Sequence, residues 1–210
     1  MAKNSGATAS EPCWYPNRTR EGEGNKAHRD LAWMVGEIVL AWNAAHTTLY
    51  LIFSDLFTNQ EEDKARAIWS LLYSDRAQRE LLEVTATAKL RDKKQLLKAV
   101  LWCTQALQKL SSYRNDAAHV GMHADPKFGV QHRQFGARLP AIERLENNPV
   151  PKYWKSLRGD LHAIESYAIS IDTALLLDRP HPFCRKPRLQ LLPPQKRRTR
   201  RKAHPQKKGK

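Results

Sequence analysis

Three side chains that could carry out acid–base chemistry on a phosphodiester lie close together in the segment 114–119. This segment contains Arg114, Asn115 and His119, and it follows a long run of apolar residues at helical spacing. An arginine is always charged and can hold a phosphate through two hydrogen bonds. A histidine titrates near neutral pH and can move a proton. If the substrate were RNA, its 2′-hydroxyl would supply the nucleophile, so this chemistry requires no metal ion and no cofactor.

The helical positions of these residues constrain how they could act. On a continuous helix Asn115 and His119 share a face, whereas Arg114 lies about 140° around the axis from His119. Arg114 could reach around the helix, the helix could loosen before Gly121, or two copies of the segment could face each other across a two-fold axis. The structural alternative is that Arg114 and His119 only stabilise a helix C-terminus, where cations are favourable.

The other histidines give weaker signals. His119 and His123 are four residues apart, but Val120 stands where a zinc protease needs its glutamate. We therefore expect no metal site. His46 lies inside a long apolar helical run, where a histidine is typical of a hydrogen-bonded core or interface position.

Five helices are expected to position the motif, so the predicted fold class is an all-α bundle. Apolar residues recur at spacings of three and four, and acidic residues or a capping serine mark helix starts. The most apolar stretch is interrupted by polar and charged residues, so a membrane span is not expected. The predicted helices cover residues 25–57, 61–72, 75–90, 91–118 and 152–178.

The segment 120–152 is expected to be a long irregular loop before the last helix. Glycine and proline recur through it, and only a short helix at 140–146 is predicted inside it. A loop of this length is usually functional or disordered. Its cations are predicted to form an RNA-binding rim: Lys127, Arg133 and Arg138.

Positive charge is concentrated at the C-terminal end. The net charge is +15, yet residues 1–178 hold 23 Lys and Arg against 21 Asp and Glu, while residues 179–210 hold 13 and no acid. Such a block favours contact with nucleic acid or another polyanion. We predict that 179–210 is a disordered basic tail. Its predicted RNA-binding residues are Lys196, Arg197, Arg198, Arg200, Arg201 and Lys202.

The remaining features indicate the cellular compartment and the domain boundaries. Cys13, Cys103 and Cys184 are widely spaced, and the N-terminus has no apolar stretch of the secretory kind. A reducing, cytoplasmic location is therefore expected. We divide the chain into a flexible segment at 1–24, a helical bundle at 25–178 and the tail.

The motif resembles the Arg-polar-x3-His signature of the HEPN superfamily. Arg114 and His119 match its two fixed positions, Asn115 matches its polar position, and the motif falls at the end of a late helix. The resemblance covers about residues 25–178. It implies a helical bundle that forms a homodimer with the motif at the interface. It further implies a metal-independent endoribonuclease acting as a toxin, in defence or in RNA processing.

Two functions of different classes follow. In the first, His119 acts as general base or acid, Arg114 stabilises the phosphorane-like state, Asn115 orients its neighbours, and the product carries a 2′,3′-cyclic phosphate. A toxin of this kind would have an antitoxin or nucleotidyltransferase partner. In the second, the chain is a non-catalytic helical adaptor or nucleic-acid-binding dimer, and the motif is structural.

Overall fold

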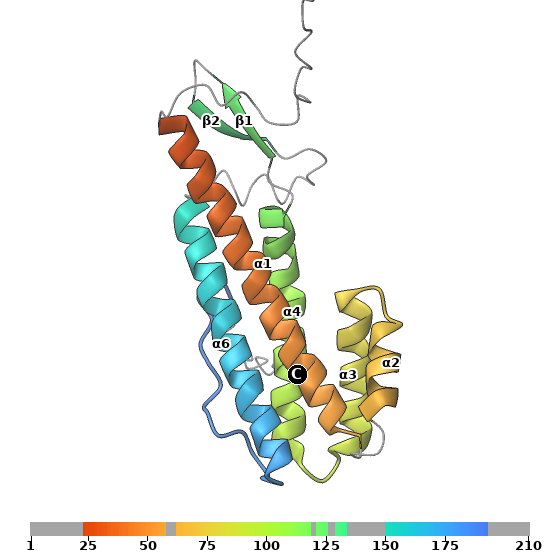
Figure 1. Cartoon of the computed structure of the whole chain (residues 1–210). Coiled ribbons are helices and arrows are strands. Elements are labelled where there is room, and N and C mark those ends of the chain that lie inside the picture. Colours follow the sequence, from red (N-terminus) through yellow and green to blue (C-terminus); the bar gives the residue numbers. More distant parts are fainter. Residues whose placement is uncertain (1–22, 58–61, 119–120, 126–128, 134–149, 193–210) are drawn as a thin grey trace, which may run out of the picture.

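The computed structural model describes residues 23–57, 62–118, 121–125, 129–133 and 150–192, and only the backbone is described at 23–28, 31, 62, 121–125, 129–133 and 150–152. These residues form five helices and one hairpin (Figure 1). The helices are α1 (Glu23–Asp55), α2 (Glu62–Ser70), α3 (Asp75–Lys89), α4 (Lys94–Ala118) and α6 (Val150–Leu176). The predicted all-α bundle is confirmed, and its helix bounds are close to those expected. No helix within the described ranges is both long enough and apolar enough to cross a bilayer.

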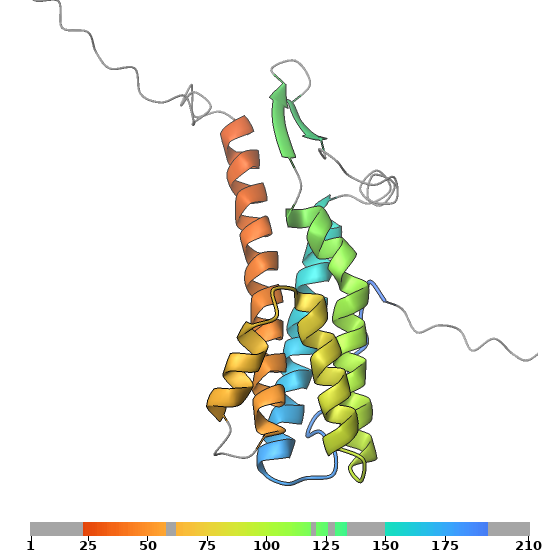
Figure 2. The same cartoon turned by 90° about the vertical axis from the view of Figure 1, so that its right-hand side faces the viewer.

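Three long helices make the frame. α1 and α6 run in the same direction, and α4 runs against both (Figures 1 and 2). α1 packs most extensively on α6. The shorter α2 and α3 form a pair beside the lower part of α1 and α4 and leave the upper ends of both helices uncovered by that pair. The start of α3 therefore lies against the side of α4, below its C-terminal end.

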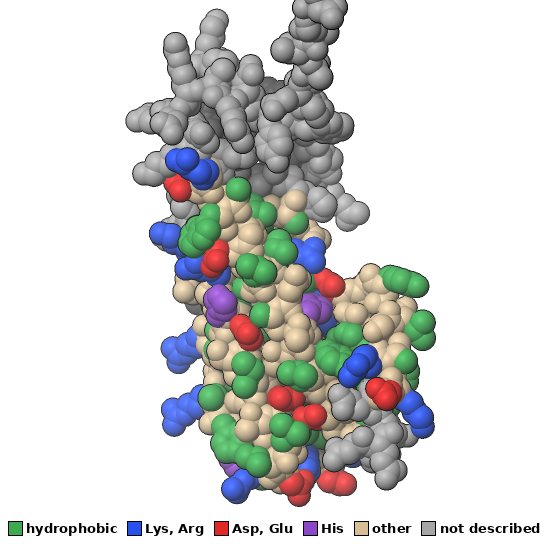
Figure 3. Space-filling model, viewed as in Figure 1, with side chains coloured by type: hydrophobic (Ala, Val, Ile, Leu, Met, Phe, Trp, Pro, Cys, Tyr) green, Lys and Arg blue, Asp and Glu red, His purple; other side chains and the backbone are tan. Residues whose placement is uncertain are grey.

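The core lies along the three long helices. Its fully buried side chains are apolar and recur at spacings of three and four on each helix, which is the pattern that drives amphipathic helices together. They include Ile38, Leu49, Ile52 and Phe53 on α1, Leu96, Leu107 and Leu110 on α4, and Leu157, Leu161 and Ile171 on α6. On the visible face of the described body, cations and carboxylates are interspersed (Figure 3), as the balanced charge of residues 1–178 suggests.

The segment 120–152 is less irregular than expected. It contains an antiparallel hairpin of β1 (Gly121–Asp125) and β2 (Gly129–Arg133), with Gly121 opposite Arg133 and Asp125 opposite Gly129. Glycine is the first residue of each strand, at Gly121 and at Gly129. Five residues per strand leave little room for a visible alternation of apolar and polar side chains, so the sequence did not indicate the strands. The short helix predicted at 140–146 lies outside the described residues.

The prediction of a disordered tail is wrong for residues 179–192, which we call the C-terminal strap. Both carboxylate oxygens of Asp160 accept backbone N–H groups from the strap, from Gln190 at 2.7 Å and from Leu191 at 2.9 Å. Leu189 is buried, and Lys186 Nζ lies 5.8 Å from the Trp102 ring centroid. The charge count hid this outcome because a short apolar run within the basic segment is enough to dock it. Residues 193–210 lie outside the described part.

Candidate active site

Arg114 lies in the last turn of α4 and is held from three sides. Its Nη2 donates to Asp75 Oδ2 at 3.1 Å, and its Nη1 donates to Asn115 Oδ1 at 3.1 Å. Its Cζ stands 5.0 Å from the centroid of the Trp42 ring, which is a cation–π distance. The Arg114 side chain remains 28% exposed. The guanidinium is thus fixed in position but still reachable from solvent.

Asp75 is the residue that joins the three helices at this point. It is the first residue of α3, which begins as predicted after the N-cap Ser74, whose hydroxyl accepts the Ala77 N–H at 3.2 Å. A carboxylate is favoured at a helix N-terminus by the helix dipole. The same Oδ2 that receives Arg114 also accepts Trp42 Nε1–H at 2.8 Å. One carboxylate oxygen therefore ties α3 to both α1 and α4.

A second arginine lies behind the Trp42 ring. Arg79 is only 4% exposed, and its Cζ lies 5.8 Å from the Trp42 centroid. Its Nη1 is 2.9 Å from His46 Nε2, and its Nη2 donates to Gln108 Oε1 at 2.8 Å. Burial lowers the pKa of Arg79, against the opposing charges of Asp75 and Glu83. We call Trp42, His46, Asp75, Arg79, Gln108 and Arg114 the polar cluster.

His46 is neutral in this setting. Burial lowers its pKa to about 4, and the positive charges of Arg79 and Arg114 act in the same direction. A guanidinium can only donate, so Arg79 must donate to Nε2 and the proton of the neutral ring must sit on Nδ1. The His46 and Trp42 rings lie 5.1 Å apart between centroids. His46 is thus a buried, hydrogen-bonded histidine, as its place in an apolar helix indicated.

The chemical capacity of the site is that of an anion-binding edge. A guanidinium has five N–H donors, and the hydrogen bonds of Arg114 to Asp75 and Asn115 use two of them. The others can face a phosphate that approaches from solvent. Asn115 is exposed beside it and can donate from its amide nitrogen. Asp75 offsets one of the two positive charges beside the Trp42 ring, so the capacity to bind an anion rests on the exposed donors of Arg114.

The structure places only part of the predicted site. Arg114 and Asn115 lie together, whereas His119 lies outside the described residues. Arg133 ends β2, and its side chain is not described. The other predicted RNA-binding residues also lie outside the described part: Lys127, Arg138, Lys196, Arg197, Arg198, Arg200, Arg201 and Lys202.

Sequence reasoning missed the partners of Arg114. In the sequence, Asp75 indicates only a favourable charge at a helix start, and Trp42 only an apolar residue in a helical run. The one available signal was the spacing of Trp42 and His46, four residues apart on one helical face. Nothing in the sequence indicated Arg79, because a buried arginine cannot be told from an exposed one by its neighbours in the chain.

Comparison with protein-family models, with curated proteins and with solved structures found no match for this chain.

Proposed function

We propose that this protein is a metal-independent endoribonuclease of the HEPN type, with Arg114 as the phosphate-binding residue. The observation that carries the proposal is that Arg114 is fixed by Asp75 and Trp42 yet remains partly exposed at the end of α4. A charge that is positioned before the substrate arrives costs little reorganisation during the reaction. The proposed setting is the cytoplasm, in a toxin, defence or RNA-processing role.

In the proposed reaction the 2′-oxygen attacks phosphorus and the bond from phosphorus to the 5′-oxygen breaks. His119 takes the 2′-hydroxyl proton, and a protonated His119 gives a proton to the leaving 5′-oxygen. Arg114 stabilises the charge on the phosphorane-like state, and Asn115 orients the phosphate. The products are a 2′,3′-cyclic phosphate and a 5′-hydroxyl.

The proposal includes a homodimer in which two copies of the segment 114–119 share one groove. Two facts support it. On a continuous helix Arg114 and His119 would lie about 140° apart around the axis, and α4 projects beyond the start of α3, so the α2–α3 pair does not cover its last turn (Figure 2). The basic residues after the strap would hold RNA in a salt-dependent way. An antitoxin or nucleotidyltransferase partner would cover the same groove.

The test is cleavage of single-stranded RNA in EDTA by the wild type, Arg114→Ala and His119→Ala. Each substitution should lower the rate at least about a hundredfold, and wild-type products should carry cyclic phosphate ends. Arg91→Ala is a matched control because Arg91 is exposed between α3 and α4. A wild type without activity, or activity that survives both substitutions, would refute the proposal.

One observation favours a second function, a non-catalytic nucleic-acid-binding adaptor. The Arg114 guanidinium already has an ion pair, a hydrogen bond and an aromatic neighbour within its own chain. On this alternative Arg114→Ala lowers only stability, and His119→Ala leaves RNA binding unchanged. Deleting residues 193–210 would then abolish RNA binding.

A further inference from the structure

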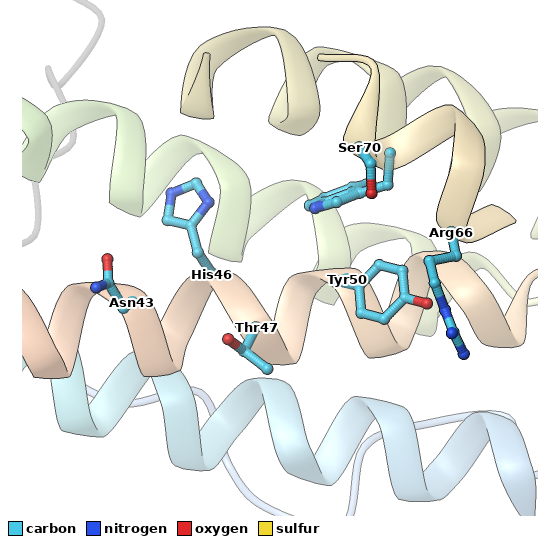
Figure 4. A pocket seen from close by; sticks show the side chains of 7 residues that line it. Asn43, His46, Thr47, Tyr50, Arg66 and Ser70 are labelled. Atoms are coloured by element: carbon cyan, nitrogen blue, oxygen red, sulfur yellow. The ribbon is translucent and has the colours of Figure 1, made fainter. Parts of the chain in front are cut away.

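A pocket of about 400 Å³ lies between α1 and α2, next to the polar cluster. Asn43, His46, Thr47 and Tyr50 line it from α1, and Arg66 and Trp69 line it from α2 (Figure 4). Figure 4 shows His46 and Asn43 at one end and Tyr50 and Arg66 towards the other. A volume of this size falls in the range of small-ligand sites.

His46 presents an unsatisfied donor at this pocket. It is only 9% exposed, and its Nδ1 is buried without a hydrogen-bond partner among the described residues. Arg79 occupies Nε2 and so fixes the proton on Nδ1. In Figure 4 this nitrogen faces the Tyr50 side of the pocket. Because buried donors are almost always satisfied, Nδ1–H points to a ligand that brings an acceptor.

The remaining walls suit a planar, polar ring. Trp69 and Tyr50 supply aromatic surface, with ring centroids 5.8 Å apart. The exposed Asn43 offers an amide that can donate and accept at the edge of a ring. Arg66 adds a positive charge that would suit a phosphate attached to it. A nucleobase combines these demands, because it has flat faces, edge acceptors and a phosphate on its sugar.

The pocket residue His46 and the Arg114 guanidinium both lie beside the ring of Trp42, whose side chain is 2% exposed. Arg114 Cζ is 5.0 Å from the Trp42 centroid, and the His46 ring centroid is 5.1 Å from it. This spacing suits two neighbouring positions of one single strand, a base in the pocket and a phosphate at Arg114.

We propose that the α1–α2 pocket binds one base of single-stranded RNA next to the phosphate held by Arg114, and so sets which base the protein prefers. This inference rests on the proposed function for its second half, the phosphate at Arg114. His46 and Asn43 read the base edge, and Trp69 with Tyr50 supports its face. Any base can stack on an aromatic side chain, whereas hydrogen bonds to the base edge distinguish one base from another.

The test is binding of homopolymeric RNA oligonucleotides, each of about ten identical nucleotides, a length suited to such grooves. All are 2′-O-methylated so that cleavage cannot occur. The wild-type chain should bind the preferred base about tenfold more tightly than the weakest, the effect of one directed hydrogen bond. Asn43→Ala and His46→Phe should reduce this preference to about twofold. Gln95→Ala, an exposed side chain on α4, is the control.

Each result decides the proposal separately from the ribonuclease. A base preference lost in both variants supports the pocket, even if no RNA is cleaved. Equal binding of all bases by the wild type, or a preference that survives Asn43→Ala in the folded protein, overturns it, even if RNA is cleaved. If a free mononucleotide binds as tightly as the oligonucleotide and Asn43→Ala abolishes this binding, the ligand is a free nucleotide and the RNA proposal falls.

Discussion

α1 buries ionisable groups at two places, and the charge is handled differently at each. In its middle, His46 sits against Arg79, and burial holds the imidazole neutral with a pKa of about 4. Near its C-terminal end, Asp55 hydrogen-bonds to Asp172 of α6, and burial together with the Asp55 charge raises the Asp172 pKa to about 7. At His46 the neighbouring charges and hydrogen bonds come from three helices, whereas at Asp55 and Asp172 the two carboxyl groups share a proton.

The difference bears on what each place can do. In the polar cluster, hydrogen bonds join side chains from α1, α3 and α4 and hold Arg114, while His46 Nδ1 and Arg79 Nε have no partner among the described residues. At the carboxyl pair, two acids repel each other once both ionise. Hydrogen bonds that join three helices fix the geometry of the side chains between them, which a binding site needs. The carboxyl pair makes the lower end of the bundle sensitive to pH.

The largest effect is expected from Arg79→Met, which removes the centre of the polar cluster. His46 Nε2 would lose its donor in a buried setting, and the exposed Gln108 would lose one hydrogen bond, so the free energy of unfolding should fall by about 2–4 kcal/mol. Denaturant unfolding measures it. Arg76→Met is the control, because Arg76 is exposed on the same helix and should change stability by less than about 0.5 kcal/mol. Equal stability of the two variants would show that the polar cluster does not stabilise the fold.

The next effect is the acid dependence of His46. Its folded pKa lies below the usual histidine value of 6.5, so its contribution to stability is full above about 6.5 and is lost as the pH falls through about 4. We expect about 2–3 kcal/mol of this loss to be absent in His46→Phe. Unfolding curves at a series of pH values would show it as a flatter profile. Parallel profiles would mean that His46 is not buried neutral.

The carboxyl pair should respond in the opposite direction. The folded Asp172 pKa is raised above 3.8, so stability is full below about 4 and is lost as the pH rises through about 7. Asp172→Asn should therefore stabilise the protein by about 1–2 kcal/mol at pH 8, discounted because the site is partly exposed. The gain should vanish near pH 4. Asp92→Asn, an exposed change, should show no such dependence.

The smallest effect on stability is expected from Asp75→Asn, at the exposed edge of the polar cluster. The ion pair to Arg114 is lost, but the Trp42 hydrogen bond can persist, so unfolding should change by about 0.5–1 kcal/mol. If Arg114 binds phosphate, RNA cleavage should fall by a larger factor, about tenfold, because its guanidinium is no longer positioned. A cleavage rate that follows stability alone would assign Asp75 a structural role only.

The fold could be predicted from the sequence to a large extent. The spacing of apolar residues gave all five described helices, and Ser74 with Asp75 marked the start of α3 as observed. These signals are local, because a helix forms from neighbours three and four apart. The hairpin and the strap could not be predicted in the same way. Strands of five residues and a short docked run depend on contacts with distant segments.

For the candidate site too, the sequence determined the local features and the tertiary structure determined the contacts between distant residues. The sequence by itself determined that Arg114 and Asn115 lie at the end of a long helix and that basic residues follow the bundle. Only the tertiary structure decided that Asp75 and Trp42 hold Arg114, and that His46 faces a pocket with a fixed donor. The reason is that these contacts join residues far apart in the chain: Arg79 and His46 are 33 positions apart, and Arg114 and Asp75 are 39 positions apart. They arise only when the start of α3 lies against the side of α4, below its C-terminal end.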